Sequence, residues 1–200
     1  MNRNRRGAHA MIERFRSRLF STAVPAAGFL ALALAPSLVA EEPADPALDY
    51  AMKNPAQPLD GVLTGGQPTA EDLEKLAERG YKTVVNLRLP SEDTGLGDEA
   101  ERVRRLGMRY VALPIAGAGD LTRENAERLA EILADEEAKP LLLHCGSSNR
   151  VGALLALEAF YVEGLDAGAA LELGKKAGLT RLEPAVRQRL AAEEDGGPGG

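Results

Sequence analysis

The 200-residue sequence predicts an α/β fold in a single domain, with a mostly parallel central sheet flanked by helices. Short apolar segments alternate with helical patterns at the spacing of right-handed strand–helix–strand units, which favours parallel strands. The apolar segments are brief and nearly continuous, as strands covered by helices on both faces are. With 44% hydrophobic and 27% charged residues, the composition excludes a collagen-like, low-complexity or wholly disordered chain.

The first forty residues have the layout of a secretory signal peptide. Six arginines oppose one glutamate near the N-terminus, and an apolar run follows up to Ala40. We expect residues 1–40 to be removed after Ala40 and the rest of the chain to be periplasmic or secreted. Leu38 is larger than the small residue favoured at that position before a cleavage site. The alternative is therefore an uncleaved membrane anchor that holds the domain outside the cytoplasm.

The remainder of the chain is acidic and contains one cysteine. The leader holds six of the 24 basic and one of the 30 acidic residues, so 18 basic and 29 acidic side chains remain, a net charge of −11. Such a surface repels nucleic acid, and we expect no nucleic-acid partner and, after cleavage, no membrane contact. Cys145 cannot form an intramolecular disulfide, even in an oxidising compartment. Its retention as an unpaired thiol in an exported protein suggests a chemical role.

The elements before the cysteine follow from local signals. Residues 41–58 are rich in Pro, Ala, Asp and Glu without clear periodicity, which predicts a linker before the domain at 59–194. Thr69 is a candidate N-cap with Asp72 in the reciprocal position, and Gly80 ends the helix that Thr69 starts. The alternating elements that we expect are a helix over 69–79, a strand over 81–88, a helix over 98–106, a strand over 108–114, a helix over 122–135 and a strand over 139–144.

Helices dominate after the cysteine. We expect them over 151–163 and 166–177, then a last one entered through Pro184, and a disordered tail over 195–200. The helix that starts at Val151 is apolar almost all round, which predicts that it is the most buried helix of the domain.

One segment combines the residue types of an anion-binding catalytic site: a buried strand ends at Cys145, a polar loop follows, and Arg150 opens a buried helix. Ligands of parallel sheets bind at the carboxyl ends of the strands, where Cys145 is expected. Backbone N–H groups of the loop and of the helix N-terminus would converge on an anion there, and Arg150 adds a bidentate fork for a tetrahedral oxyanion. The same groups favour the thiolate form of a cysteine. The loop residues that we expect to bind the substrate are Gly146, Ser147, Ser148 and Asn149.

Two further residues lie close to this segment. His144 precedes the cysteine, but adjacent residues of a strand point to opposite faces, so we expect a hydrogen-bonded structural histidine rather than a base for Cys145. It is the only histidine after the leader, which argues against a zinc site, and we expect neither a metal nor a cofactor. Arg88, at the carboxyl end of another strand, is a candidate substrate-binding residue. Pairing with Glu92 or Asp93 is the alternative.

Five segments carry a resemblance to a known family. They are 65–68 (GGQP), 83–88 (TVVNLR), 119–122 (GDLT), 144–152 (HCGSSNRVG) and 177–180 (AGLT). On these segments the chain resembles the bacterial beta-lactamase-hydrolase-like phosphatases, of the dual-specificity, protein-tyrosine-phosphatase-like superfamily of cysteine phosphatases. The resemblance implies a phosphocysteine mechanism: Cys145 attacks phosphorus, Arg150 and the loop amides bind the phosphoryl oxygens, and an upstream aspartate protonates the leaving group.

Asp120 is the candidate for that aspartate. It lies in the loop after a predicted strand, upstream of Cys145, and it is free of helix capping because Thr122 is the better N-cap. Asp93 is the alternative. We therefore expect an enzyme that hydrolyses a phosphate monoester, carried either by a phosphorylated protein or by a small molecule.

Three departures from the family pattern leave two other functions open. Four residues separate Cys145 from Arg150, where tyrosine phosphatases have five. The shorter spacing is that of rhodanese-like sulfurtransferases, which would carry a persulfide on Cys145. Ser148 is found where relatives usually have Gly, so a left-handed backbone there would cost about 1 kcal/mol or more. Val151 replaces the Ser or Thr that often helps to expel the thiolate. The last two departures favour a domain that binds an oxyanion without turnover.

Overall fold

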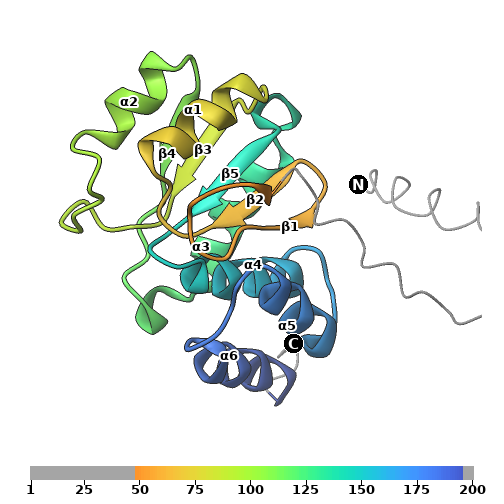
Figure 1. The fold of residues 1–200 in the computed structure, drawn as a ribbon. Helices are drawn as coiled ribbons and strands as arrows, with labels where there is room; N and C mark the ends of the chain where they lie inside the picture. Colours follow the sequence, from red (N-terminus) through yellow and green to blue (C-terminus); the bar gives the residue numbers. More distant parts are fainter. Residues whose placement is uncertain (1–47, 196–200) are drawn as a thin grey trace, which may run out of the picture. The chain divides into compact units, whose positions relative to one another are not determined.

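The computed structural model describes residues 48–195, and the predicted signal peptide over 1–40 lies outside the described residues. The described chain forms a five-stranded sheet in the order β1-β2-β5-β3-β4 (Figure 1). Strands β2, β5, β3 and β4 run parallel, and β1 is antiparallel to β2. The predicted single α/β domain with a mostly parallel sheet is therefore confirmed. The strands are β1 (Ala56–Leu59), β2 (Val62–Gly65), β3 (Thr83–Asn86), β4 (Arg109–Ala112) and β5 (Leu141–His144).

Helices cover both faces of the sheet (Figure 1). Leu142 of β5 belongs to the core under α1 and α2, whereas its neighbours Leu141 and Leu143 belong to the larger core under α3 and α4. Helices α5 and α6 pack beyond α4 on that second face. The helices are α1 (Ala70–Glu78), α2 (Glu99–Arg105), α3 (Arg123–Ala134), α4 (Asn149–Tyr161), α5 (Ala167–Lys176) and α6 (Glu183–Asp195), with the short 3-10 helices η3 (Ala118–Asp120) and η4 (Glu136–Ala138).

The caps of α1 and α3 are those that the sequence predicts. At α1, Thr69 Oγ1 accepts a hydrogen bond from the Asp72 amide at 3.1 Å, and Asp72 Oδ2 accepts one from the Thr69 amide at 2.9 Å. At α3, Thr122 Oγ1 accepts a hydrogen bond from the Asn125 amide at 3.2 Å. Each cap satisfies N–H groups that the first helical turn leaves without a partner.

The predicted linker over 41–58 is too long. Tyr50 and Met52 are buried in the core under α1, and Met52 leaves no room for a side chain at Gly65 of β2. Strand β1 begins inside the predicted linker, and the sequence analysis also missed β2. Pro58 within β1, and Gly65 and Gly66 at the end of β2, are typical of turns and loops, which explains both misses. At the other end, α6 includes Asp195, the first residue of the predicted tail, and 196–200 lie outside the described residues.

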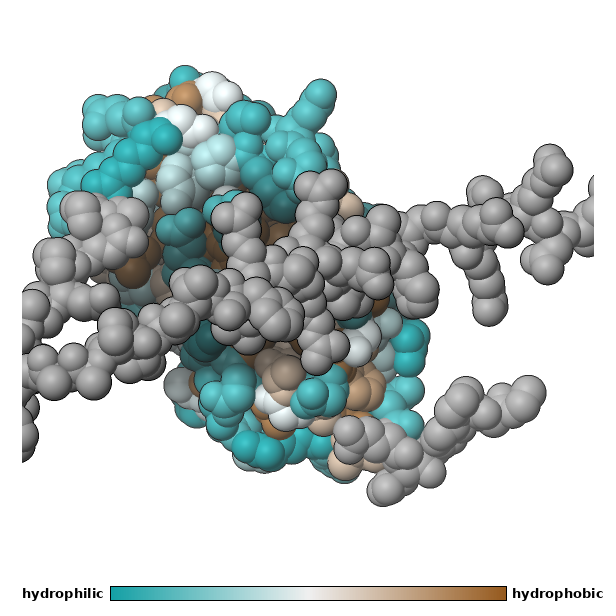
Figure 2. All heavy atoms as spheres, turned by 90° about the vertical axis from the view of Figure 1, so that its right-hand side faces the viewer, coloured by the Kyte–Doolittle hydropathy of each residue, from teal (hydrophilic) through white to brown (hydrophobic). Residues whose placement is uncertain are grey.

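Figure 2 shows the face of the molecule on the side of β1 and α5. Hydrophilic residues cover most of its upper part, and apolar residues are visible among the helices of its lower part. Among residues 48–195, no helix is long and apolar enough to cross a membrane. In the same range no three His, Cys, Asp or Glu side chains are grouped as ligands of a metal ion.

Candidate active site

Cys145 lies at the carboxyl end of the central strand β5, as predicted. Its amide donates to the Gly65 carbonyl of β2 at 3.3 Å, which fixes the end of the strand against its neighbour. Its side chain is 1% exposed and belongs to the core on the α4 face of the sheet. Helix α4 begins four residues later at Asn149, so Arg150 occupies its first turn.

Helix α4 is held rigidly behind this loop. Its residues 151–159 are all buried, which confirms the prediction of a most buried helix. At Gly152 the backbone of α4 touches the backbone at Gly174 and Leu179 so closely that no side chain would fit. The close approach explains a glycine within a helix, where glycine is otherwise unfavourable. The start of α4 therefore has a fixed position relative to Cys145.

The side chains of Ser148 and Asn149 face away from Cys145. Ser148 adopts the left-handed conformation (φ 67°) that the sequence analysis considered costly, and its hydroxyl donates to the Ala177 carbonyl at 2.7 Å. The Asn149 Oδ1 accepts hydrogen bonds from the Thr180 amide and hydroxyl and from the Leu182 amide. Their side chains therefore tie the loop to the α5–α6 connection, and only their backbone N–H groups are left to face a ligand at Cys145.

Arg150 is oriented by a bidentate ion pair. Its Nη1 and Nη2 donate to the two carboxylate oxygens of Glu92 at 2.6 and 2.8 Å, and Nη1 also donates to the Ile115 carbonyl at 2.9 Å. These contacts use three of the five guanidinium N–H groups, and the guanidinium also has a hydrogen bond to Cys145. Nη2 also lies over the loop, 3.6 Å from where a Cβ on Gly146 would be.

The charges around Arg150 reinforce each other. The Arg150 hydrogen bonds lower the pKa of Glu92 from 4.5 to about 2, despite its partial burial. The pKa of Arg150 is raised first by its hydrogen bond to Glu92 and then by the neighbouring Cys145. The sequence analysis considered Glu92 only as a partner of Arg88. The pairing with Arg150 depends on the path of the loop after β3, which no local pattern reveals.

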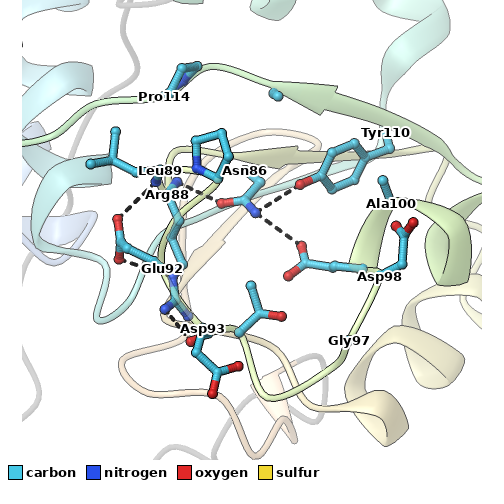
Figure 3. A pocket seen from close by; sticks show the side chains of 14 residues that line it. Asn86, Arg88, Leu89, Glu92, Asp93, Gly97, Asp98, Ala100, Tyr110 and Pro114 are labelled. Atoms are coloured by element: carbon cyan, nitrogen blue, oxygen red, sulfur yellow. Dashed lines mark hydrogen bonds and ion pairs between the residues drawn. The ribbon is translucent and has the colours of Figure 1, made fainter.

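Arg88 also contacts Glu92, the carboxylate that binds Arg150. Its Nε lies 3.1 Å from Glu92 Oε2, Nη1 donates to Gln67 Oε1 at 2.6 Å, and Nη2 donates to the Asp93 carbonyl at 2.6 Å. The predicted alternative, pairing with Glu92 or Asp93, is therefore what the structure shows. Arg88 lines a pocket of about 550 Å³ beside the carboxyl ends of β3 and β4, in which Glu92, Asp93 and Tyr110 also lie (Figure 3).

His144 has the structural position that the sequence predicts. Its Nε2 lies 2.8 Å from Glu99 Oε1, on the α2 face of the sheet and opposite to the Cys145 side chain. Glu99 also accepts from Gln67 Nε2 at 2.7 Å. Burial acts to raise the pKa of Glu99, but the hydrogen bond and charge of His144 hold it below its ordinary value.

Asp120 lies in η3, on the loop whose first residues contact Arg150. The Ile115 carbonyl accepts from Arg150, and Asp120 Oδ2 accepts from the next amide, that of Ala116, at 2.7 Å. Thr122 caps α3, so the Asp120 carboxylate is free of that task, as predicted. The alternative acid, Asp93, uses its carboxylate to accept from the Gly95 amide at 2.8 Å.

The fold and this site have the architecture of the protein-tyrosine-phosphatase-like class. A thiol follows the central strand β5, a loop of four residues comes next, and an arginine lies in the first turn of the buried helix α4. The chain belongs to the family described as "DSP-PTPase phosphatase fused to NAD+ Kinase", whose model matches residues 53–181. The superfamily predicted from the sequence is therefore confirmed.

Curated relatives match part of the chain. A "Beta-lactamase hydrolase-like protein" of Xylella fastidiosa (strain Temecula1 / ATCC 700964) is 33% identical over 99 residues, which are 48% of this chain and 22% of the relative. One from Agrobacterium fabrum is 27% identical over 99 residues, again 48% of this chain and 22% of the relative. The chain thus spans about a fifth of the length of these relatives.

Solved structures share the fold. Tk-PTP in its active form is 23% identical with a TM-score of 0.53, over 71% of this chain and 97% of that one. The core catalytic domain of the PP-IP phosphatase SIW14 from S. cerevisiae also has this fold. It is 16% identical with a TM-score of 0.55, over 72% of this chain and 89% of that one. At these identities the likeness supports the architecture described above.

Proposed function

We propose that this protein is an exported phosphatase that hydrolyses a phosphate monoester through a phosphocysteine intermediate. The observation that carries the proposal is the geometry of the loop from Cys145 to Arg150. The buried Cys145 thiol follows β5, the loop 146–149 comes next, and Arg150 lies in the first turn of α4 with its guanidinium held by Glu92 and hydrogen-bonded to Cys145. Preorganised donors of this kind stabilise the charge that develops on a transferring phosphoryl group.

The reaction follows from these positions in two displacements. In the first, the Cys145 thiolate attacks phosphorus, the P–O ester bond breaks, and Asp120 gives its proton to the leaving oxygen. In the second, water attacks phosphorus, the S–P bond breaks, and the Asp120 carboxylate takes the proton of the water. Arg150 and the loop amides bind the phosphoryl oxygens throughout, and inorganic phosphate leaves.

Two substrate classes fit this chemistry, a phosphorylated protein and a small-molecule phosphate ester. The SIW14 structure is that of a PP-IP phosphatase, which illustrates the second class on the same fold. The pocket beside β3 and β4 adjoins Arg88 and Glu92, and it is the natural position for the group that carries the phosphate. A comparison of a phosphotyrosine peptide with an inositol phosphate, each at equal concentration, would distinguish the two classes.

A sulfurtransferase is the competing function, because four residues between Cys145 and Arg150 are also the spacing of rhodanese-like enzymes. Persulfide chemistry needs no acid for an alkoxide, so a carboxylate at Asp120, on the loop that contacts Arg150, favours phosphoryl transfer. Purified protein assayed with p-nitrophenyl phosphate, and separately with thiosulfate plus cyanide, should release phosphate and form no thiocyanate. Thiocyanate formation that depends on Cys145, without phosphate release, would replace the phosphatase with a sulfurtransferase.

Export is supported by the arginine-rich start and the apolar run before Ala40. The full chain with a C-terminal tag, expressed in a Gram-negative host, should appear in the periplasm with a new N-terminus near residue 41. An intact Met1 in the membrane fraction would replace secretion with anchoring.

A further inference from the structure

A second pocket lies at the end of the sheet opposite to Cys145. Its volume is about 610 Å³, within the usual range for small-ligand sites. Lys139 marks the entry to β5 and Val62 the start of β2, so the pocket is at the amino ends of these strands. Its walls are mostly apolar and come from the β1–β2 turn, from α3, and from the ends of α4 and α5, with Leu59, Val62, Leu133, Ala159, Leu165 and Leu173 among the lining residues.

Glu158 of α4 is the buried charged group of this pocket. Glu158 is only 3% exposed, and it lines the cavity. Within residues 48–195, its carboxyl group has neither a hydrogen bond nor an ion pair. A buried carboxylate without a partner is costly, and proteins usually provide one. Here the carboxyl group instead faces an open space large enough for a ligand.

The other charged groups at the pocket do not satisfy Glu158. Asp60 comes from the β1–β2 turn and Glu163 from the segment that follows α4, and both are acidic. Lys139 is the one cation among the lining residues of this pocket, and its Nζ is bound to Glu136 at 2.8 Å. Burial, and then the charge of Glu163, raise the pKa of Glu158 to about 7. The pocket is therefore apolar, negatively charged and short of a cation.

We propose that this pocket binds a small aliphatic ammonium ion, whose charged group pairs with Glu158 and whose alkyl part covers the apolar wall. The ligand supplies the hydrogen-bond donors that Glu158 lacks, and a charge-assisted hydrogen bond in a partly closed site is a strong one. The alkyl part removes apolar surface of Leu59, Val62 and Leu133 from water. This site is distinct from the cysteine site and does not depend on the proposed phosphatase activity.

Calorimetric titration of the purified protein with hexylammonium chloride at pH 8 tests the proposal. We expect saturable binding at one site, and no binding of hexanoate or of hexanol at the same concentrations. Binding should weaken when the pH falls from 8 to 6, because Glu158 takes up a proton in this range while the amine stays charged.

Glu158→Gln is the decisive variant, and Glu78→Gln is its matched control, since Glu78 is an exposed residue on α1. Glu158→Gln should weaken hexylammonium binding about tenfold or more, as expected for loss of a charged partner, and should remove its pH dependence. Glu78→Gln should bind like the parent protein. Thermal unfolding shows that each variant is folded before the titration.

The proposal is overturned if hexylammonium does not bind, if Glu158→Gln binds it as well as the parent protein, or if hexanol binds equally well. The last result would mean that the pocket selects only apolar ligands and that Glu158 stays protonated. If Glu158→Gln fails to fold, Leu133→Trp, which fills the apolar wall and leaves Glu158 in place, provides the second variant. It should also lose hexylammonium binding, and unchanged binding would contradict the proposed site.

Discussion

His144 and Cys145 are adjacent in the sequence and both are buried, yet their surroundings differ completely. The His144 ring lies on the α2 face of the sheet and is bound to Glu99 at 2.8 Å. The Cys145 thiol lies on the α4 face, where it interacts with the Arg150 guanidinium. The alternation of side chains along a strand separates the two groups across the sheet. A buried polar group with bonded partners stabilises the fold, whereas a buried thiol beside an anion site is available for chemistry.

The largest effect on activity is expected at Cys145. Cys145→Ser should lower hydrolysis of p-nitrophenyl phosphate by about 10⁴-fold or more, because a serine hydroxyl without a base is a poor nucleophile. Inorganic phosphate should still bind, since Arg150 and the loop amides remain. His144→Gln, on the other side of the same strand, should retain activity within about tenfold, since it acts only by positioning. Equal losses in the two variants would contradict the separation of the two faces.

Asp120→Asn gives the next largest effect, and it depends on the leaving group. Turnover of an alkyl phosphate should fall by about 10²-fold or more, because its leaving oxygen needs a proton. The first displacement of p-nitrophenyl phosphate, measured as the initial burst of nitrophenolate, should slow much less, since nitrophenolate leaves without a proton. Asp93→Asn is the matched control. If it shows the selective loss instead, Asp93 is the acid, and equal losses on both substrates would argue against acid catalysis by either residue.

Most of the cysteine site could be predicted from the sequence, and the reason is local. The apolar strand, the four-residue loop and the apolar helix from Val151 are contiguous, so their order alone places Cys145 and Arg150 on one anion site. Glu92 was not identified as the partner of Arg150 because the two are joined only through the loop after β3. Long-range pairs of this kind depend on the tertiary fold, which a local pattern does not contain.

In the fold, too, the features set by local sequence were predicted and those set by long-range contacts were missed. Thr69 and Thr122 were predicted as caps because capping depends on residues within one turn. Strands β1 and β2 were missed because Pro58 in β1 and the glycines at the end of β2 resemble a loop. Their place in the sheet is set by long-range contacts: β2 pairs with β5, β1 pairs with β2, and Tyr50 and Met52 are buried against the core.

Glu99→Gln tests how much the buried pair of Glu99 and His144 contributes to stability. Removing one partner of a buried pair should lower the free energy of unfolding at pH 7 by about 3 kcal/mol. The folded pKa of Glu99 is below its ordinary value, so this stabilisation is present above the ordinary pKa of 4.5 and is lost as the pH falls through the folded value. Urea unfolding of the parent and the variant from pH 7 down to pH 3 measures the difference in unfolding free energy and its dependence on pH. A difference between parent and variant that grows towards low pH would contradict the pair.

The smallest effect concerns the backbone of the loop. Ser148→Ala and Ser148→Gly both lose the hydrogen bond to the Ala177 carbonyl, but only glycine is relaxed at φ 67°. The free energy of unfolding of the glycine variant should therefore be about 1 kcal/mol higher than that of the alanine variant. Equal stabilities would mean that the left-handed backbone at Ser148 carries no cost.

The central claim is that Cys145 carries the phosphoryl group during turnover. Asp120→Asn, mixed with p-nitrophenyl phosphate and quenched rapidly in acid, slows the second displacement and should accumulate the intermediate. Peptide mass spectrometry should then find one phosphoryl group on the peptide that contains Cys145, and none in the Cys145→Ser, Asp120→Asn double variant. Release of phosphate with no adduct on Cys145, or an adduct that persists without Cys145, would contradict the mechanism.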